Sequence, residues 1–263
     1  MTDKFHIDVD YYHLPRRAGR QESDFLRASL HWDLHVHRAA LVLVDMWSEH
    51  YVSSHLQRGQ QITEQRIVPL LETFRNAGAT VVHAPSPDCA PRYGHLLTEA
   101  ADPPDSMQPE SLQRDWPPAS FRSKSGEFAA FARPADPQDD EFNRIIAERS
   151  IMAEVEPQQG DCVVFTGEQL HAVLRDRGVT TLFYVGFAAN MCVPNRDYGM
   201  RAMRGRGYDV VLVRDCTSAI EVADSVAELG LTAAAVRDVE TVIGYSIEST
   251  SLCQGAPNRG SGR

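Results

Sequence analysis

The sequence predicts an α/β fold in which one doubly wound parallel sheet of six strands carries helices on both faces. Short apolar runs rich in β-branched residues alternate along the chain with segments whose apolar residues recur at helical spacing. Runs that are apolar at nearly every position indicate strands buried on both faces, which is typical of a parallel sheet. Because such strands are joined through helices, the alternation predicts right-handed β-α-β units. No internal repeat and no linker divides the 263 residues.

Each element is predicted from its own pattern. The apolar run AALVLVDM is the first strand, and the helix after it ends at Gly78, which stands where a capping glycine belongs. The six strands are expected at residues 39–46, 79–86, 161–165, 180–187, 208–215 and 245–250. The helices between them are expected at residues 62–78, 167–178, 191–207 and 222–244.

Three further segments complete the expected domain organisation. Residues 1–36 are polar without clear periodicity and are expected to form an N-terminal extension. Residues 37–251 are expected to form the α/β domain, with an irregular insertion at 87–157 that contains ten prolines. Loops of this length are usually lids, binding loops or interface arms, so we expect the insertion to cap a pocket or to reach a partner subunit. The Gly-, Pro- and Arg-rich tail, 252–263, is expected to be disordered.

Composition argues against several classes of function. The net charge of −10 argues against nucleic acid or an anionic membrane surface as a partner, because both select basic faces. No window approaches the ~18 apolar residues of a membrane span, and the N-terminus lacks the apolar segment of a secretory signal, so a cytoplasmic protein is expected. Five cysteines without a CxxC pair indicate reduced thiols. The absence of GxGxxG and GxxxxGKS/T loops argues against a nucleotide cofactor.

Asp45 and Cys192 are the candidate functional residues, because ligands of an open parallel sheet bind at the carboxyl ends of its strands. Asp45 ends the first strand, and Cys192 follows the fourth at the start of a helix. The free N–H groups and the dipole of a helix start favour a thiolate and can hold an oxyanion. A thiolate nucleophile with a carboxylate that moves its proton suits acyl transfer. Alternatively, Cys192 is a small buried apolar residue and Asp45 is only a turn or capping residue.

Two segments resemble the isochorismatase-like cysteine hydrolase family. They are VLVDMW around Asp45 and GFAANMCVPNRDYGMRAMRGRGYDVVLVRDCTSAIE around Cys192, and the resemblance extends over residues 38–86 and 157–250. It implies the sheet order 3-2-1-4-5-6 for the six strands, a homodimer or homotetramer, and a small-molecule substrate. Most members of the family hydrolyse C–N bonds of small amides, and no organic cofactor is expected. Metal-binding members carry an Asp-x-His pattern that Ser48-Glu49-His50 does not reproduce, so no metal is expected.

The resemblance also implies roles within the site. Cys192 would attack a carbonyl carbon, Asp45 would carry the proton, and the backbone N–H groups of Met191 and Cys192 would bind the oxyanion. A non-proline cis peptide bond just ahead of the cysteine would lie between Ala188 and Ala189. The residues expected to line the substrate pocket are Trp47, Tyr51, Asn190 and Arg196.

One departure from the family pattern concerns its third residue, a lysine after the third strand. Here the chain reads Val163-Val164-Phe165-Thr166, without that lysine. Either Lys124 in the insertion replaces it, or an arginine such as Arg122 or the helix dipole stabilises the thiolate. A homologue with weakened catalysis that acts in binding or assembly is one alternative function. An enol-ether hydrolase of the isochorismatase type, which does not need Cys192, is another.

Overall fold

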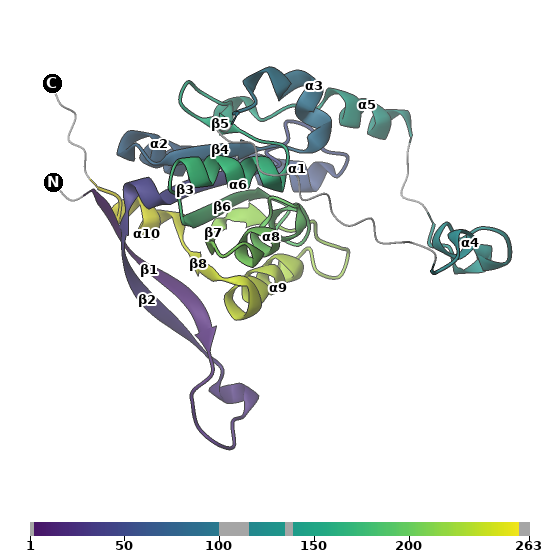
Figure 1. The fold of residues 1–263 in the computed structure, drawn as a ribbon. Coiled ribbons are helices and arrows are strands. Elements are labelled where there is room, and N and C mark those ends of the chain that lie inside the picture. Colours follow the sequence, from purple (N-terminus) through teal and green to yellow (C-terminus); the bar gives the residue numbers. More distant parts are fainter. Residues whose placement is uncertain (1–2, 100–115, 135–138, 258–263) are drawn as a thin grey trace.

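The computed structural model describes residues 3–99, 116–134 and 139–257. Within them, a sheet of eight strands has the order β2-β1-β8-β7-β6-β3-β4-β5 (Figure 1). The strands are β1 (Lys4–His13), β2 (Leu26–His35), β3 (Ala39–Val44), β4 (Thr80–Ala84), β5 (Cys162–Val163), β6 (Thr181–Phe187), β7 (Asp209–Ser218) and β8 (Tyr245–Ile247). The strands from β3 to β8 are parallel, and their order is the 3-2-1-4-5-6 order expected of the six strands.

Ten α-helices lie within the described residues. They are α1 (Ser53–Ile62), α2 (Val68–Ala77), α3 (Ala90–Tyr93), α4 (Ala119–Arg122), α5 (Asp140–Glu148), α6 (Gly167–Asp176), α7 (Cys192–Asn195), α8 (Met200–Gly205), α9 (Gly230–Asp238) and α10 (Ser249–Gln254). As predicted, α2 ends at Gly78, whose φ of +71° is a left-handed conformation that glycine adopts without strain. None of the described helices is long and apolar enough to cross a membrane.

Strand β3 lies inside the parallel part of the sheet and shows why the apolar runs form strands there. All six of its residues are buried, and alternate side chains pack on opposite faces. Leu41 and Leu43 belong to one apolar core together with residues of α2 and α10. Val42 and Val44 belong to a second core together with residues of α6 and α8. The prediction of a sheet covered by helices on both faces is therefore confirmed.

The N-terminal extension was predicted to lack periodic structure, but it forms a regular β-hairpin. β1 and β2 pair antiparallel along all ten residues of each strand, and β1 joins β8 through Asp10 and Ser246. The sheet therefore has eight strands instead of the six expected. In β1, Phe5, Ile7 and Val9 are buried and polar residues alternate with them, which is the period of a strand with one covered face. The hairpin extends away from the body of the sheet (Figure 1).

Several predicted helices have different bounds. The first helical run starts earlier than expected, at Ser53, and passes through a π-helical turn at Thr63–Ile67 before α2. The helix predicted at 191–207 is divided into α7 and α8. The helix predicted at 222–244 begins only at Gly230. Apolar spacing alone detected these helical regions but not the points at which each helix starts or breaks.

The end of the chain also differs from the prediction. β8 ends at Ile247, and α10 then includes the first three residues of the predicted tail, 252–263. This part of the chain is ordered because it docks on β1: the N–H of His6 donates to the carbonyl of Gly255 (2.8 Å). Residues 258–263 lie outside the described residues.

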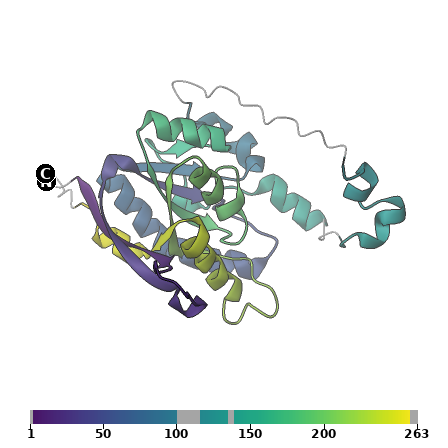
Figure 2. The same cartoon turned by 60° about the horizontal axis from the view of Figure 1, so that its bottom comes forward.

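The insertion at 87–157 is partly helical where it is described, which also corrects the sequence analysis. α5 begins after Asp139, whose carboxylate accepts a hydrogen bond from the N–H of Phe142. Trp47 pairs with Ile151 in an antiparallel bridge, so the end of the insertion is joined to the segment after β3. α4 stands apart from the sheet in both ribbon views (Figures 1 and 2). Residues 100–115 and 135–138 of the insertion lie outside the described residues.

Candidate active site

Asp45 lies at the carboxyl end of β3, where the chain leaves the sheet. Its N–H still donates to the carbonyl of Ala84 in β4 (3.2 Å), while its φ of +47° turns the chain. The N–H of Trp47 donates back to the carbonyl of Asp45 (2.9 Å) and closes the turn. Aspartate adopts this left-handed conformation more readily than most residues do. Asp45 is fully buried in this position.

The buried carboxylate of Asp45 is held by side chains from two other parts of the chain. Oδ1 accepts a hydrogen bond from Ser86 Oγ (2.9 Å), and Oδ2 accepts one from Arg196 Nη2 (3.1 Å). Burial raises the pKa of Asp45, whereas the Arg196 guanidinium and the hydrogen bonds from Cys192 and Ser86 act in the opposite direction. These partners offset part of the cost of burying a carboxylate, and the pKa of Asp45 stays above its ordinary value.

Cys192 is the first residue of α7, and its thiol lies beside the carboxylate of Asp45, close enough for the two groups to shift each other's pKa. Burial and the negative charge of Asp45 raise the pKa of the thiol to about 12, against the opposing effect of Arg196. The thiol is therefore protonated in the resting site. This corrects the expectation that the helix start favours the thiolate. α7 has only four residues, so its dipole is small beside the full charge of Asp45.

A break between α7 and α8 brings Arg196 to Asp45. Pro194 lies in the short helix α7, and the chain becomes extended at Arg196, where ψ is 160°. At Gly199, a Cβ atom would lie 2.9 Å from backbone atoms of Arg196 and Pro194, so the turn requires a residue without a side chain. The predicted continuous helix is therefore interrupted.

Arg196 is the cation beside Asp45, where the sequence analysis had considered Lys124 or Arg122 as a cation for the site. It was expected in the substrate pocket, but its Nη2 atom instead contacts Asp45 and Ser86, each at 3.1 Å. Lys124 is not brought to Asp45: its Nζ atom lies 3.4 Å from the ring centre of Phe121, on the segment that stands apart from the sheet (Figure 1). Arg122 is on that same segment, in α4, and donates to the carbonyl of Pro117. The cation beside this carboxylate is therefore an arginine from the α7–α8 connection.

Ser86 connects the residues of the site, although the sequence analysis did not select it. It follows β4, donates to Asp45, and accepts hydrogen bonds from Trp47 Nε1 (3.0 Å) and Arg196 Nη2 (3.1 Å). A hydroxyl has one donor and two acceptor positions, and all three are used here. Its place at the carboxyl end of the second expected strand was the signal in the sequence that could have identified it.

Tyr198 is a second residue that the sequence analysis missed. Its hydroxyl lies 3.4 Å from Asp45 Oδ1 and 3.2 Å from the carbonyl oxygen of Pro85. The side chain is completely buried, and burial together with the charge of Asp45 raises its pKa, so it remains a neutral hydrogen-bond donor. Its position depends on the break after α7, for which Pro194 and Gly199 were the signals in the sequence.

The backbone around Cys192 corrects two further expectations. The N–H of Met191 already donates to the carbonyl of Ala188 (3.0 Å), so of the two expected oxyanion donors only Cys192 starts a helix without an intrahelical acceptor. The non-proline cis peptide bond joins Phe187 to Ala188, one residue earlier than the expected Ala188–Ala189 bond. β6 pairs with β7 as far as Phe187 and Ser218, and the chain turns immediately after that pair.

The expected pocket residues have different surroundings. Trp47 is buried beside Ser86, while Tyr51 is half-exposed and packs on His50 and on Phe142 of α5, with ring centres 4.4 Å and 4.9 Å apart. Asn190 is not free for a substrate, because its side-chain amide exchanges two hydrogen bonds with the backbone of Ile220, both 3.2 Å. Asn190 therefore anchors the loop after β7.

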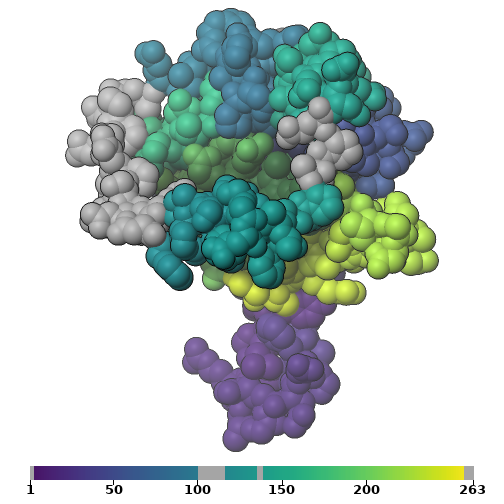
Figure 3. Space-filling view, turned by 90° about the vertical axis from the view of Figure 1, so that its right-hand side faces the viewer, coloured from purple at the N-terminus to yellow at the C-terminus, as the bar shows by residue number. Residues whose placement is uncertain are grey.

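One face of the molecule is hollowed. Figure 3 shows this face: the green part of the chain, which includes the β6–α7 region, forms the floor of a hollow, and the segment with α4 stands in front of it. In the described residues, the group with metal-ligand spacing is His6, His31 and Asp33, which belongs to the N-terminal hairpin and not to this site.

The fold and the site define an α/β protein with a cysteine–carboxylate pair at the carboxyl ends of its strands. Residues 39–243, more than half of the chain, match the family model described as the Isochorismatase domain. The chain therefore belongs to the isochorismatase family. No curated protein matches it in sequence.

Solved structures with similar folds include three from bacteria and archaea. A cysteine hydrolase from Pseudomonas syringae pv. phaseolicola 1448A is 16% identical over 86% of this chain and 95% of its own, with a TM-score of 0.54. An isochorismatase family protein from Desulfovibrio vulgaris subsp. vulgaris str. Hildenborough is 21% identical over 82% and 97%, with a TM-score of 0.49. The N-carbamoylsarcosine amidase from Thermoplasma acidophilum is 18% identical over 81% and 96%, with a TM-score of 0.43. At this low identity, the likeness to the Pseudomonas syringae cysteine hydrolase supports the fold alone.

Proposed function

We propose that the protein is a cysteine-dependent hydrolase that cleaves the C–N bond of a small amide or related acyl compound through a thioester intermediate. The observation that carries this proposal is the placement of the Cys192 thiol beside the buried Asp45 carboxylate, which Arg196 and Ser86 hold in place. A thiol beside a carboxylate that can take its proton is the minimal pair for nucleophilic acyl transfer.

In the first half of the reaction, Asp45 takes the proton of Cys192 while the sulfur attacks the carbonyl carbon. The developing oxyanion is bound by the N–H of Cys192 at the start of α7. The C–N bond then breaks, the acyl group stays on sulfur as a thioester, and Asp45 returns the proton to the leaving nitrogen. The thiolate exists only while the substrate is bound, which is consistent with a resting pKa of about 12.

In the second half, water replaces the amine. Asp45, again a carboxylate, takes a proton from the water as its oxygen attacks the thioester carbon. The C–S bond breaks, the carboxylic acid leaves, and the proton on Asp45 returns to the sulfur of Cys192. Each step moves one proton to or from the same carboxylate, so Asp45 must be charged at the start of each half.

Arg196 keeps Asp45 charged. Burial alone favours the neutral acid, and the guanidinium 3.1 Å away opposes that effect. Because an arginine is effectively always protonated, it is a permanent counter-ion and not a proton carrier. In this proposal Arg196 is a positioning residue, whereas Cys192 and Asp45 are catalytic.

The experiment is a screen for ammonia or amine release from small primary amides, ureides and N-carbamoyl compounds. The wild-type chain is expected to hydrolyse members of one class, and Cys192→Ala and Asp45→Asn are expected to abolish that turnover. The half-buried thiol of Cys253 gives the matched control, Cys253→Ala, which should retain activity. Binding without turnover would instead indicate a binding protein, and turnover that survives Cys192→Ala would indicate chemistry without a cysteine nucleophile.

A further inference from the structure

One face of the N-terminal hairpin carries two histidines and two aspartates on neighbouring cross-strand pairs. His6 of β1 lies opposite Asp33 of β2, and Asp8 lies opposite His31. Residues two positions apart on a strand point to the same side, so all four side chains share one face of the ribbon. These side chains are 46–68% exposed, and solvent ions reach them freely.

The ligand atoms of this cluster already lie close together. His6 Nδ1 is 2.6 Å from Asp33 Oδ1, and His31 Nε2 is 3.5 Å from the same oxygen. His6, His31 and Asp33 each offer one ligand atom within 4.8 Å of the other two. A tetrahedral zinc ion with bonds of about 2.0–2.1 Å sets its ligand atoms about 3.3 Å apart. Exposed side chains reach that spacing by small changes of rotamer, without movement of the backbone.

The remaining residue, Asp8, fixes the orientation of one imidazole. Its Oδ1 atom lies 2.8 Å from His31 Nδ1, so Nδ1 carries the proton and Nε2 is the free, ligating nitrogen. A carboxylate behind a ligating histidine is the usual outer partner in zinc sites. The two histidines therefore have different supports: His31 is oriented by Asp8, and His6 is paired with the ligand Asp33 itself.

We propose that His6, His31 and Asp33 bind a divalent transition-metal ion of the zinc class, with Asp8 as the residue that orients His31. Two imidazole nitrogens and one carboxylate oxygen suit Zn²⁺ better than Mg²⁺ or Ca²⁺, which prefer oxygen ligands. Three protein ligands leave the fourth tetrahedral position to water or to another donor. The ion joins β1 to β2 and stabilises the hairpin.

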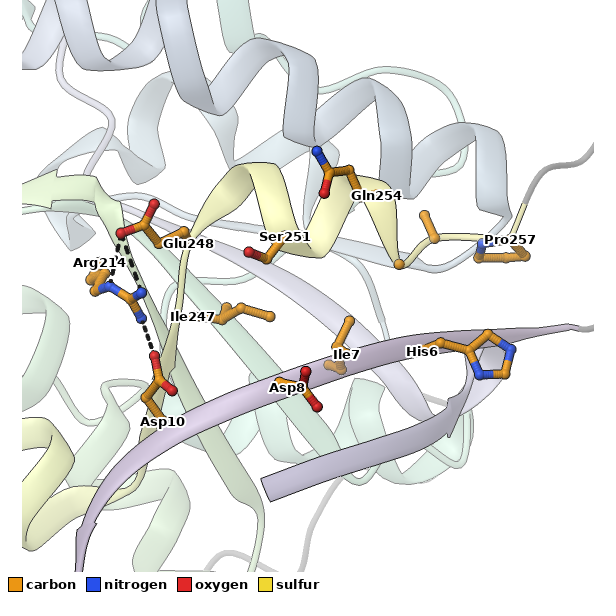
Figure 4. Close-up of a pocket in the computed structure, with 12 residues that line it drawn as sticks. His6, Ile7, Asp8, Asp10, Arg214, Ile247, Glu248, Ser251, Gln254 and Pro257 are labelled. Carbon is orange, nitrogen blue, oxygen red and sulfur yellow. Dashed lines mark hydrogen bonds and ion pairs between the residues drawn. The ribbon is translucent and has the colours of Figure 1, made fainter. Parts of the chain in front are cut away.

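The site adjoins a cavity of about 570 Å³ between the hairpin and α10 (Figure 4). His6 and Asp8 are among its lining residues. At another part of the cavity wall, Arg214 pairs with Asp10 (2.9 Å) and Glu248 (3.2 Å), as the dashed lines in Figure 4 show. This metal site lies outside the residues that match the isochorismatase domain, so it is independent of the proposed hydrolase chemistry.

The test is a calorimetric titration of the full metal-free chain with Zn²⁺, together with the absorption spectrum of Co²⁺ bound to it. We expect about one Zn²⁺ per chain, and a Co²⁺ spectrum of nitrogen and oxygen ligands without thiolate charge-transfer bands. His6→Ala and His31→Ala should each weaken binding by about 10-fold or more, since loss of an outer partner alone costs at least that much in known sites.

The matched control is the double variant His35→Ala/His37→Ala. His35 ends β2 and His37 follows it, with ring centres 5.4 Å apart, but neither is part of the proposed ligand set. This variant should bind Zn²⁺ like the wild type. The proposal is overturned if the wild type binds no Zn²⁺, if His6→Ala and His31→Ala bind it unchanged, or if the control loses binding equally. Circular dichroism of each variant checks that the fold is retained.

Discussion

Arg196 donates a hydrogen bond to Asp45 across 3.1 Å, although 151 positions separate the two residues in the sequence. Asp45 follows β3, the first strand of the parallel sheet, and Arg196 lies in the break after α7, the helix that begins at Cys192. The pair gives a buried carboxylate its counter-ion beside the candidate nucleophile. Four properties of the molecule depend on this arrangement or on the segments that support it.

Removal of the Arg196 guanidinium should reduce turnover without unfolding the chain. In Arg196→Ala the buried carboxylate loses its counter-ion, favours the protonated form, and no longer takes the Cys192 proton. We expect kcat to fall about 100-fold, with partial recovery in Arg196→Lys, because lysine restores the charge but not the planar geometry. Arg206→Ala, which removes only a surface pair with Glu168, is the control and should leave kcat unchanged. Equal losses in the two alanine variants would contradict the role of Arg196.

Ser86→Ala should lower stability because Ser86 makes three buried hydrogen bonds. The substitution leaves Trp47 Nε1 without its acceptor and removes a donor from Asp45. An unsatisfied buried polar group costs about 1–3 kcal/mol, and we expect the free energy of unfolding to fall by that amount. Urea denaturation measures it, with exposed Ser54→Ala in α1 as a control that should change stability by less than about 0.5 kcal/mol. An unchanged stability in Ser86→Ala would show that the network is not formed.

Gly186→Ala should disrupt the sheet beside the site. At Gly186, φ is +107° and a Cβ atom would lie 2.0 Å from the carbonyl oxygen of Val44, the residue before Asp45. We expect a loss of stability above about 3 kcal/mol, because both the backbone and the adjoining strand must move. Gly205→Ala, at the end of α8 with open space around it, should instead stabilise the chain by about 0.5–1 kcal/mol. Thermal unfolding of both variants compares these effects, and equal melting temperatures would contradict the geometry.

The stabilising effect of the Asp161 carboxylate should be lost in acid. Although burial raises its pKa, hydrogen bonds from His83, Arg75 and the N–H of Gln158 lower it to about 2. Because the unfolded-state pKa is ~3.9, this carboxylate stabilises the fold above about pH 4, and the stabilisation is lost as the pH falls toward 2. We expect Asp161→Asn to reduce the free energy of unfolding at pH 7 by about 1–2 kcal/mol, and by less near pH 2.

Urea unfolding of Asp161→Asn at pH 7, 4 and 2.5 measures this dependence. Exposed Asp224→Asn serves as the control, because its side chain lies on the surface of the turn before α9. A difference between Asp161→Asn and the wild type that stays constant over this pH range would contradict the depressed pKa of Asp161.

The parallel sheet could be predicted because its strands are largely buried on both faces and therefore mostly apolar, whereas its strand order was implied by the family resemblance. Asp45 and Cys192 could be selected because ligands of such a sheet bind at the carboxyl ends of its strands. The two strands that carry them, β3 and β6, are neighbours in the sheet. The hairpin was missed although Phe5, Ile7 and Val9 alternate with polar residues, because that alternation is short and the rest of the extension is polar.

The supporting residues of the site could not be predicted from local patterns. Arg196 and Tyr198 reach Asp45 only because the helix breaks after α7, and apolar spacing over 191–207 gives no sign of that break. Ser86 acts through contacts with three residues that are distant in sequence. Such positions depend on tertiary packing, which spacing along one chain does not encode.

In the proposed reaction Asp45 takes the proton of Cys192, and the rate of Cys192 alkylation by iodoacetamide against pH tests this most directly. Peptide mass spectrometry follows the wild type and Asp45→Asn, with Cys253 as the internal reference. In the wild type, the rate at Cys192 should still rise at pH 10, since its pKa is about 12. In Asp45→Asn the negative charge is gone while Arg196 remains, so the titration should move to lower pH even though amide turnover is lost. The same titration curve in both proteins would contradict the account.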